Sequence, residues 1–398
     1  MSLSLSEKAK RVKPSSTLAI TAKAKAMRAE GIDVVGFGAG EPDFNTPENI
    51  CKAAIDAIND GFTKYTPASG TDELKAAISQ KFHDFNNLTY APNQIVVSNG
   101  GKQGLQNVFS AILNPGDEVL VPAPYWLSYP EMIKLADGKP VYVVATKEND
   151  YKVTADQIQS AITKNTKALV LNTPSNPTGS IYTREELVAI ADVVVKNDIY
   201  VVSDEMYEYL IYGDDEHVSI ASLGEEIYKR TITCSGLSKS YAMTGWRIGY
   251  VGASVEIAKL MSAIQSHETS NPNSIAQKAA VEALTGPQFT VDVMKNEFDK
   301  RRKYMYDRIC KMPYLSCNEP RGAFYLFIDA GEVSEKEYDG KKVGNAAELA
   351  KILLEDYSVA VIPCADFGFP NHFRLSYAIS IEQIEKGLNR IQKFLEAL

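Results

Sequence analysis

Short β-rich segments alternate with longer amphipathic helical patterns between residues 46 and 286, and this alternation restricts the fold more than any other feature. Strands that are joined by helices run parallel, so such a chain builds a mostly parallel sheet with helices on both faces. The segments predicted as strands are residues 95–97, 118–121, 141–144, 168–171, 200–203, 231–234 and 248–251. The pattern therefore predicts an α/β fold whose seven-stranded sheet is sandwiched by helices.

The pattern changes after residue 288. We predict a charged helix over 291–312, a strand over 323–328, a helix over 346–357, strands over 359–362 and 373–378, and a final helix over 381–397. This order is typical of a smaller α+β domain, and a helix over 16–30 is expected to pack with it. We therefore expect a large domain over 46–290 and a small domain formed by both chain ends, 1–45 and 291–398.

Composition limits the classes of function. The 398 residues include 45% hydrophobic and 23% charged residues, which is typical of a globular protein. The net charge of −8 argues against a nucleic-acid or membrane partner, and no apolar run is long enough to span a bilayer. The five cysteines and four histidines show no metal-ligand spacing, so we expect a cytoplasmic protein without a metal site.

The run GLSKSYAMTGWRIG, residues 236–249, places Lys239 and Arg247 in a loop of small residues after a predicted strand. A lysine that is partly desolvated at a strand end can lose its proton and form a Schiff base. An arginine nearby can hold a phosphate through two parallel hydrogen bonds. A phosphorylated aldehyde needs both groups, and pyridoxal phosphate is the common biological example. Taken by itself, such a loop is more often a solvated turn.

The other strand ends supply groups that fit the same ligand, because open α/β sheets bind ligands beyond the carboxyl ends of their strands. Candidates at these ends are Gly101 and Lys102 for a phosphate, Trp126 for stacking on a ring, Asn176 and Tyr207 for a ring oxygen, and Asp204 for a protonated pyridine nitrogen. Each also has an ordinary structural interpretation, such as a tight turn, an Asx turn, a helix cap or a core tryptophan. Their joint occurrence at one sheet edge favours the cofactor.

With these motifs, nearly the whole chain resembles the class I pyridoxal-phosphate-dependent aminotransferases of fold type I. The resemblance rests on GEPDF at 40–44, KYTP at 64–67, NTPSNPTG at 172–179, SDEMY at 203–207, the Lys239 run and FRLS at 373–376. It implies that pyridoxal 5'-phosphate is the cofactor and that the enzyme is a homodimer with shared active sites. It also implies that amino acids and 2-oxo acids are the substrates.

The resemblance also assigns roles residue by residue. For the cofactor ring, it implies Lys239 as the Schiff-base lysine, Asp204 as the partner of the pyridine nitrogen, Asn176 and Tyr207 as ligands of the ring oxygen, and Trp126 as the stacking residue. For the cofactor phosphate, it implies Arg247, the amides of Gly101 and Lys102, and Tyr65 of the neighbouring subunit. For the substrate α-carboxylate, it implies Arg374 with Gly40. The phosphate serine of the family is Gly236 here, and either Ser235 or Ser238 could compensate.

Within the family the chain is most similar to a bacterial aspartate aminotransferase branch in which a lysine and a serine, here Lys102 and Ser15, hold the distal carboxylate. This implies transfer of the amino group of an L-amino acid, aspartate first, to 2-oxoglutarate. Aromatic or prephenate transamination and a lyase on the same fold stay open. A dinucleotide-binding loop at 35–40 is disfavoured, because Glu41 and Pro42 follow and no helix pattern opens there. A ligand-sensing regulator would need a basic patch that the chain lacks.

Overall fold

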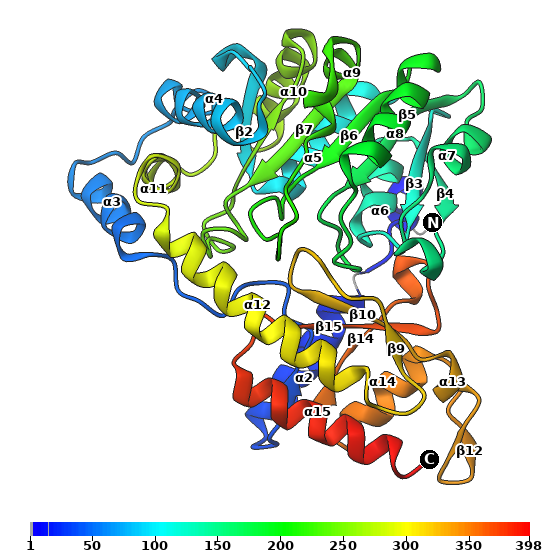
Figure 1. Ribbon diagram of the computed structural model, residues 1–398. Helices are drawn as coiled ribbons and strands as arrows, with labels where there is room; N and C mark the ends of the chain where they lie inside the picture. Colours follow the sequence, from blue (N-terminus) through cyan, green and yellow to red (C-terminus); the bar gives the residue numbers. More distant parts are fainter. Residues whose placement is uncertain (1–2, 15) are drawn as a thin grey trace.

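The computed structural model describes residues 3–14 and 16–398. Its centre is a seven-stranded sheet (Figure 1) with the strand order β2-β8-β7-β6-β5-β3-β4. The strands are β2 (Ile95–Asn99), β3 (Glu118–Ala123), β4 (Lys139–Val144), β5 (Thr166–Asn172), β6 (Tyr200–Asp204), β7 (Thr231–Gly236) and β8 (Ile248–Gly252). Every strand predicted before residue 286 is present. Neighbouring strands run parallel except that β8 is antiparallel to both β2 and β7.

Helices cover both faces of this sheet because successive strand residues point to opposite sides. On one face, Val96, Val119, Val170 and Val202 pack with α5 (Gly101–Ile112), α6 (Ser128–Leu135) and α10 (Val255–Glu268). On the other face lie α7 (Ala155–Ala161), α8 (Arg184–Lys196) and α9 (Glu225–Arg230), together with α3 (Glu48–Asn59), α4 (Asp72–Asn86) and α11 (Ser274–Thr285) nearer β2 and β8. The sheet is therefore buried on both sides, which is what its nearly continuous apolar strands require.

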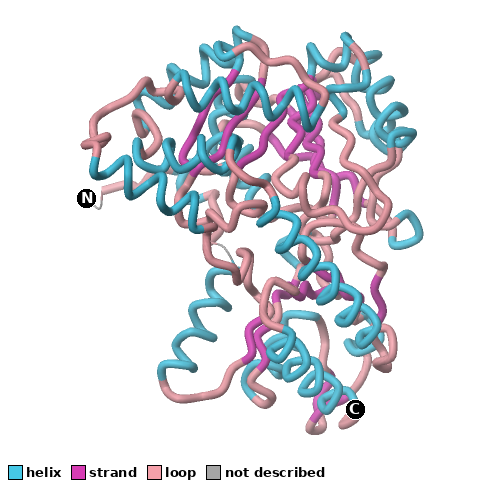
Figure 2. Tube along the Cα trace, turned by 60° about the vertical axis from the view of Figure 1, so that its left-hand side comes forward, coloured by secondary structure: helices cyan, strands magenta, loops and turns pink. Residues whose placement is uncertain are grey.

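A second, antiparallel sheet with the order β14-β15-β10-β9 lies below the first in Figure 1. Its strands are β9 (Ser316–Cys317), β10 (Tyr325–Asp329), β14 (Ile362–Pro363) and β15 (His372–Ser376). The helices around it are α2 (Ser16–Ala29), α12 (Phe289–Ile309), α14 (Ala346–Glu355) and α15 (Ile381–Leu395), while β1 (Val35–Gly36) pairs in parallel with β13 (Val359–Ala360). Figure 1 shows α2, from the start of the chain, among these C-terminal elements, and Figure 2 shows the strands of the two sheets as separate upper and lower groups. The domain boundaries at residues 46 and 290 stay a prediction.

Two predicted strands differ in detail. The segment 359–362 is not one strand, because β13 pairs with β1 whereas β14 pairs with β15 in the other sheet. The segment 323–328 enters its strand only at Tyr325, because Ala323 has a φ of 58°, a left-handed conformation that a β-strand does not contain. The remaining short elements are α1 (Glu7–Lys10), α13 (Gly331–Ser334), β11 (Glu337–Tyr338) and β12 (Lys341–Lys342).

Within residues 3–14 and 16–398, no helix combines the length and the apolar character that crossing a membrane requires.

Candidate active site

A cavity of about 490 Å³ lies at the carboxyl ends of the parallel strands. Its lining brings together side chains from the large sheet and from both chain ends. The predicted residues in this lining are Gly40, Gly101, Lys102, Trp126, Asn176, Asp204, Tyr207, Lys239, Arg247 and Arg374. Residues that are 334 positions apart in the chain, Gly40 and Arg374, therefore face one space. The residues predicted from the strand ends share this cavity with Gly40 and Arg374, which the family resemblance supplied, and their roles stay a prediction.

Asp204 ends β6 with its side chain buried in the cavity wall. The Tyr129 hydroxyl donates to Asp204 Oδ2 at 2.6 Å, and the Met206 N–H donates to Oδ1 at 3.2 Å. Burial raises the pKa of Asp204 to about 6, although the two hydrogen bonds act in the opposite direction. Turns rather than a helix follow Asp204, so it is not a helix cap. A buried carboxyl group of this kind is stabilised in its charged form by a cation in the cavity.

Lys239 lies in the loop after β7, is partly buried and lines the cavity. Its ammonium nitrogen donates to the carbonyl oxygen of Gly40. Burial lowers the pKa of Lys239 to about 8, and Arg374 and Arg247 act in the same direction while Glu41 opposes them. The unprotonated amine, which is the nucleophilic form, is therefore well populated near neutral pH.

Arg374 and Asn176 meet across the cavity, one from β15 and one from the loop after β5. Arg374 Nη1 donates to Asn176 Oδ1 at 2.7 Å, and the guanidinium carbon lies 4.2 Å from the centre of the Tyr325 ring. Arg374 Nε is buried without a hydrogen-bond partner among the described residues. Asn172 fixes the loop by accepting from the Asn176 N–H at 2.8 Å and donating to the Asp204 carbonyl at 2.9 Å. An unpaired buried arginine donor indicates an anionic ligand.

The start of α5 and Arg247 form a second anion site. The helix begins at Gly101 after Gly100, which has a φ of 83°. A Cβ on Gly100 would collide with the guanidinium of Arg247, and a Cβ on Gly249 would collide with the backbone nitrogen of Gly101. The glycines thus allow an arginine and the first N–H groups of a twelve-residue helix to approach each other. Such an arrangement suits a phosphate.

Lys102 and Trp126 lie next to each other on the same wall. The Lys102 nitrogen is 5.0 Å from the centre of the Trp126 ring, and burial, helped by Arg247, lowers the pKa of Lys102. Trp126 contacts Tyr129 edge to face, with ring centres 5.3 Å apart. One face of the indole is therefore held by the protein core, while the residue still lines the cavity.

Three predicted positions need separate comment. Tyr65 lies outside the cavity with 91% of its surface exposed, so within one chain it contacts no part of the site. Ser15 falls outside the described residues. At Gly236 a Cβ would lie 3.0 Å from Gly249 Cα and from the Ile248 carbonyl, which leaves no room for a serine. Of the two alternatives, Ser235 donates to Glu208 away from the cavity, whereas Ser238 lines it.

Sequence reasoning missed Tyr129 and Tyr325. The Tyr325 hydroxyl lies 3.0 Å from that of Tyr207, and its ring supports Arg374. Tyr129 had a usable signal, because it follows the predicted stacking residue Trp126 by only three positions, and the two rings are in contact. Tyr325 had no such signal, since only the pairing of β10 with β15 brings it beneath Arg374.

The comparisons with known proteins agree with this geometry. The family model described as "Aminotransferase class I and II" matches residues 32–391, so this chain belongs to that family of transaminases. The chain is 50% identical to an aspartate aminotransferase of Bacillus sp. (strain YM-2) over 98% of its own length and 99% of that protein.

Two further relatives extend the comparison. The chain is 47% identical to an aspartate/prephenate aminotransferase of Cereibacter sphaeroides, covering 99% of both chains. The crystal structure of an aspartate aminotransferase from Rhizobium meliloti superposes with a TM-score of 0.96, with 40% identity and complete coverage of both chains. The predicted fold, that of the fold type I aminotransferases, is thereby confirmed.

Proposed function

We propose that this chain is a pyridoxal-phosphate-dependent aminotransferase that transfers the amino group of L-aspartate to 2-oxoglutarate. The observation that carries the proposal is the convergence of Lys239, Asp204 and Arg374 on one cavity, with an arginine donor left unpaired. Relatives that match this chain over nearly its whole length are named aspartate aminotransferases. The proposed assembly is a homodimer.

The residues present fit the cofactor. The N-terminus of α5 and Arg247 form a cradle that a Cβ on Gly100 would fill, and they would hold the phosphate. Asp204 would hold the protonated ring nitrogen, because a buried carboxylate needs a cationic partner. Asn176 Nδ2 and the Tyr207 hydroxyl would bind the ring oxygen. When bound, pyridoxal phosphate supplies an aldehyde that condenses with amines and a ring that accepts an electron pair.

The chain's own residues divide the remaining work. Arg374 would bind the α-carboxylate of the substrate through its free donors, which orients the α-carbon toward Lys239. The amine of Lys239, whose pKa of about 8 leaves a useful fraction unprotonated, would then remove the α-proton as a general base and return it at a neighbouring carbon. Asp204 would keep the proton on the ring nitrogen during this transfer. General acid–base catalysis of this kind contributes roughly 10²–10⁴-fold.

Aspartate is favoured as the donor because it carries a second carboxylate and the cavity holds a further cation, Lys102. Lys102 lies in the first turn of α5, beside Trp126 and the proposed phosphate cradle. Ser15 would assist it. Prephenate as an acceptor is a second candidate, because a relative 47% identical to this chain is named for aspartate and prephenate.

Product analysis tests the proposal. The protein supplied with pyridoxal phosphate, aspartate and 2-oxoglutarate should form oxaloacetate and glutamate in equal amounts, and Lys239→Ala should abolish both. Prephenate in place of 2-oxoglutarate measures the second candidate in the same assay. Release of ammonia or carbon dioxide without glutamate would identify a lyase and refute the proposal.

A further inference from the structure

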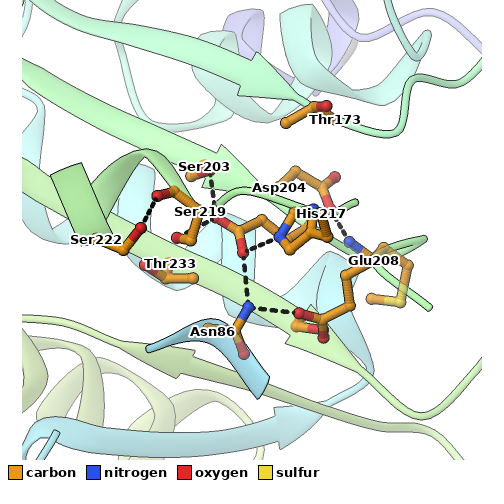
Figure 3. Close-up of polar contacts among 12 residues, drawn as sticks. Asn86, Thr173, Ser203, Asp204, Glu208, His217, Ser219, Ser222 and Thr233 are labelled. Carbon is orange, nitrogen blue, oxygen red and sulfur yellow. Dashed lines mark hydrogen bonds and ion pairs between the residues drawn. The ribbon is translucent and has the colours of Figure 1, made fainter. Parts of the chain in front are cut away.

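A buried polar network lies next to Asp204 (Figure 3), and none of its members lines the cavity. Its centre is Glu205, whose surface is completely buried. Glu205 Oε1 accepts from the hydroxyls of Ser203 at 2.8 Å and Ser219 at 2.7 Å. Glu205 Oε2 lies 2.7 Å from His217 Nε2 and accepts from the Asn86 amide at 3.1 Å. Both oxygens of this carboxylate are thus held by protein donors.

Glu208 extends the network by one turn. Its Oε2 accepts from the Asn86 amide at 2.7 Å, so this single amide bridges the two carboxylates. Glu208 Oε1 accepts from Lys81 and from Ser235, and the Lys81 ammonium also donates to Asn86 Oδ1 at 2.8 Å. Lys81 is itself buried and comes from α4, a helix distant in sequence.

The Glu205 carboxyl group favours its ionised form despite its burial. Burial raises the pKa of Glu205, but the His217 imidazole and the serine hydrogen bonds outweigh this effect and hold the pKa below its usual value. A buried carboxylate with such partners is costly to disturb, because removing one partner leaves the others unpaired. Glu205, Glu208 and His217 lie close enough together to suggest a metal site. Lys81, Asn86 and the serines, however, already donate to the carboxylate oxygens.

The placement of this network on the chain is its most informative property. Between Asp204 and Glu208, Asp204, Met206 and Tyr207 line the cavity, whereas Glu205 and Glu208 enter the network. The backbone supports this alternation, because the Glu205 N–H donates to the Cys234 carbonyl at 2.8 Å and the Glu208 N–H donates to the Glu205 carbonyl at 2.9 Å. Asp204 and Tyr207, the two residues assigned to the cofactor ring, are therefore each followed directly by a glutamate that is held by the network.

We propose that Glu205 is a positioning residue that fixes Asp204 and Tyr207 against the cofactor ring through the network of His217, Asn86, Lys81 and Glu208. This inference rests on the proposed function. The phosphate anchors, Arg247 and the start of α5, belong to other segments and have no hydrogen bond to Glu205 within the described chain. Loss of the Glu205 carboxylate should therefore loosen the ring contacts and spare the phosphate contacts.

The test compares Glu205→Gln with Glu118→Gln in the full-length chain. Glu118 is a matched control, a mostly buried carboxylate at the first residue of β3, at the opposite end of the same sheet. It accepts from Lys139 at 2.9 Å and Thr163 at 2.6 Å. Dissociation constants are measured for pyridoxal phosphate and for inorganic phosphate by quenching of tryptophan fluorescence. Steady-state kcat and KM for aspartate are measured on the cofactor-loaded protein. Ser219→Ala, which removes one donor to Glu205, is the milder second variant.

We expect Glu205→Gln to weaken binding of pyridoxal phosphate about tenfold and to lower kcat about tenfold, with inorganic phosphate binding and KM within about twofold of wild type. Ser219→Ala should shift the same quantities in the same direction by about threefold, and Glu118→Gln should shift none of them. Equal weakening of both ligands in Glu205→Gln or Ser219→Ala would show a merely structural role and overturn the inference, as would unchanged values. A wild-type protein that does not bind pyridoxal phosphate would instead refute the proposed function.

Discussion

Burial shifts the pKa values of Lys239 and Asp204 toward each other. The lysine falls to about 8 and the aspartate rises to about 6, because an environment that excludes water favours the neutral form of both. The two residues are therefore prepared for opposite tasks. Lys239 can act as an amine, and Asp204 gains from a positive charge placed beside it.

Lys239 should react with pyridoxal phosphate in a pH-dependent way. Its reaction with an aldehyde requires the unprotonated amine, so the rate rises as pH increases through the pKa and levels off above it. We expect the rate at which pyridoxal phosphate reacts with the cofactor-free protein to be half-maximal near pH 8. For a lysine with an ordinary pKa, the half-maximal rate would fall at about pH 10.4. Stopped-flow absorbance across pH 6–11 measures the rate. A profile that keeps rising up to pH 10 would contradict the assignment of Lys239.

Asp204→Asn should lose activity and gain stability. In the folded, cofactor-free protein the pKa of Asp204 is about 6, above the unfolded value of about 3.9. The folded protein therefore binds the proton of this carboxyl group more tightly than the unfolded protein does. The carboxylate thus lowers stability above pH 6, by about 2–3 kcal/mol at most, and this effect vanishes below pH 4.

Urea unfolding of the cofactor-free variant should therefore show a higher midpoint than wild type at pH 7.5 and a similar midpoint near pH 4. The variant should still bind pyridoxal phosphate, while kcat for aspartate falls at least tenfold because the ring nitrogen loses its partner. Near-normal turnover in Asp204→Asn would refute its role, and equal urea midpoints at pH 7.5 would refute the raised pKa.

At the scale of elements, the start of α5 brings the phosphate cradle and Lys102 into the same wall. A lysine is a mobile point charge rather than a rigid fork, so its discrimination between side chains should be modest. A charge-assisted hydrogen bond from Lys102 to a distal carboxylate is worth roughly 1.5–3 kcal/mol, which corresponds to about a tenfold to hundredfold preference.

Lys102→Ala should therefore lower kcat/KM for aspartate at least tenfold more than kcat/KM for tyrosine. The rival explanation is that Lys102 only supports the cofactor phosphate. In that case both substrates would lose activity in the same proportion, and the affinity for pyridoxal phosphate would fall as well. Parallel measurement of both substrates and of cofactor affinity decides between the explanations.

The residues at strand ends could be predicted from the sequence, whereas those that depend on strand pairing could not. Asp204 and Lys239 were predictable because Asp204 ends a buried apolar strand and Lys239 lies three residues after another, and parallel strands place their carboxyl ends at one edge. Tyr325 and the crowding at Gly236 were not predictable, because each depends on which strands become neighbours. The network around Glu205 escaped notice for a similar reason, since Lys81 and Asn86 reach it from α4.

The cavity is lined by segments that lie far apart in the chain. Gly40 precedes the large sheet in the chain and Arg374 belongs to the second sheet, yet both line the cavity of Lys239. Several apolar side chains on helices that cover the seven-stranded sheet are exposed in the single chain. Ile55 and Ile58 of α3 and Leu260 of α10 are each more than half exposed, and Tyr65 is 91% exposed. We propose that a second copy of the chain covers Tyr65, which then reaches the neighbouring site.

Complementation tests the shared site. Dimers that join a Lys239→Ala chain to a Tyr65→Ala chain contain one site with both native residues. If Tyr65 serves the neighbouring site, an equal mixture exchanged at low concentration should recover roughly a quarter of wild-type activity, because half of the dimers are mixed. The unmixed Lys239→Ala protein should be inactive. A protein that sediments as a monomer in analytical ultracentrifugation and is fully active at the same concentration would contradict the shared site.

The most direct test of the central claim is identification of the lysine that carries the cofactor. The protein is loaded with pyridoxal phosphate, reduced with borohydride, digested and sequenced by mass spectrometry. We predict one stoichiometric pyridoxyl label on the peptide that contains Lys239, and its loss in Lys239→Ala, because this lysine lines one cavity with Asp204, Arg247 and Arg374 and has a lowered pKa. A label on Lys102 or on any other lysine, with Lys239 unmodified, would contradict this assignment of the active site.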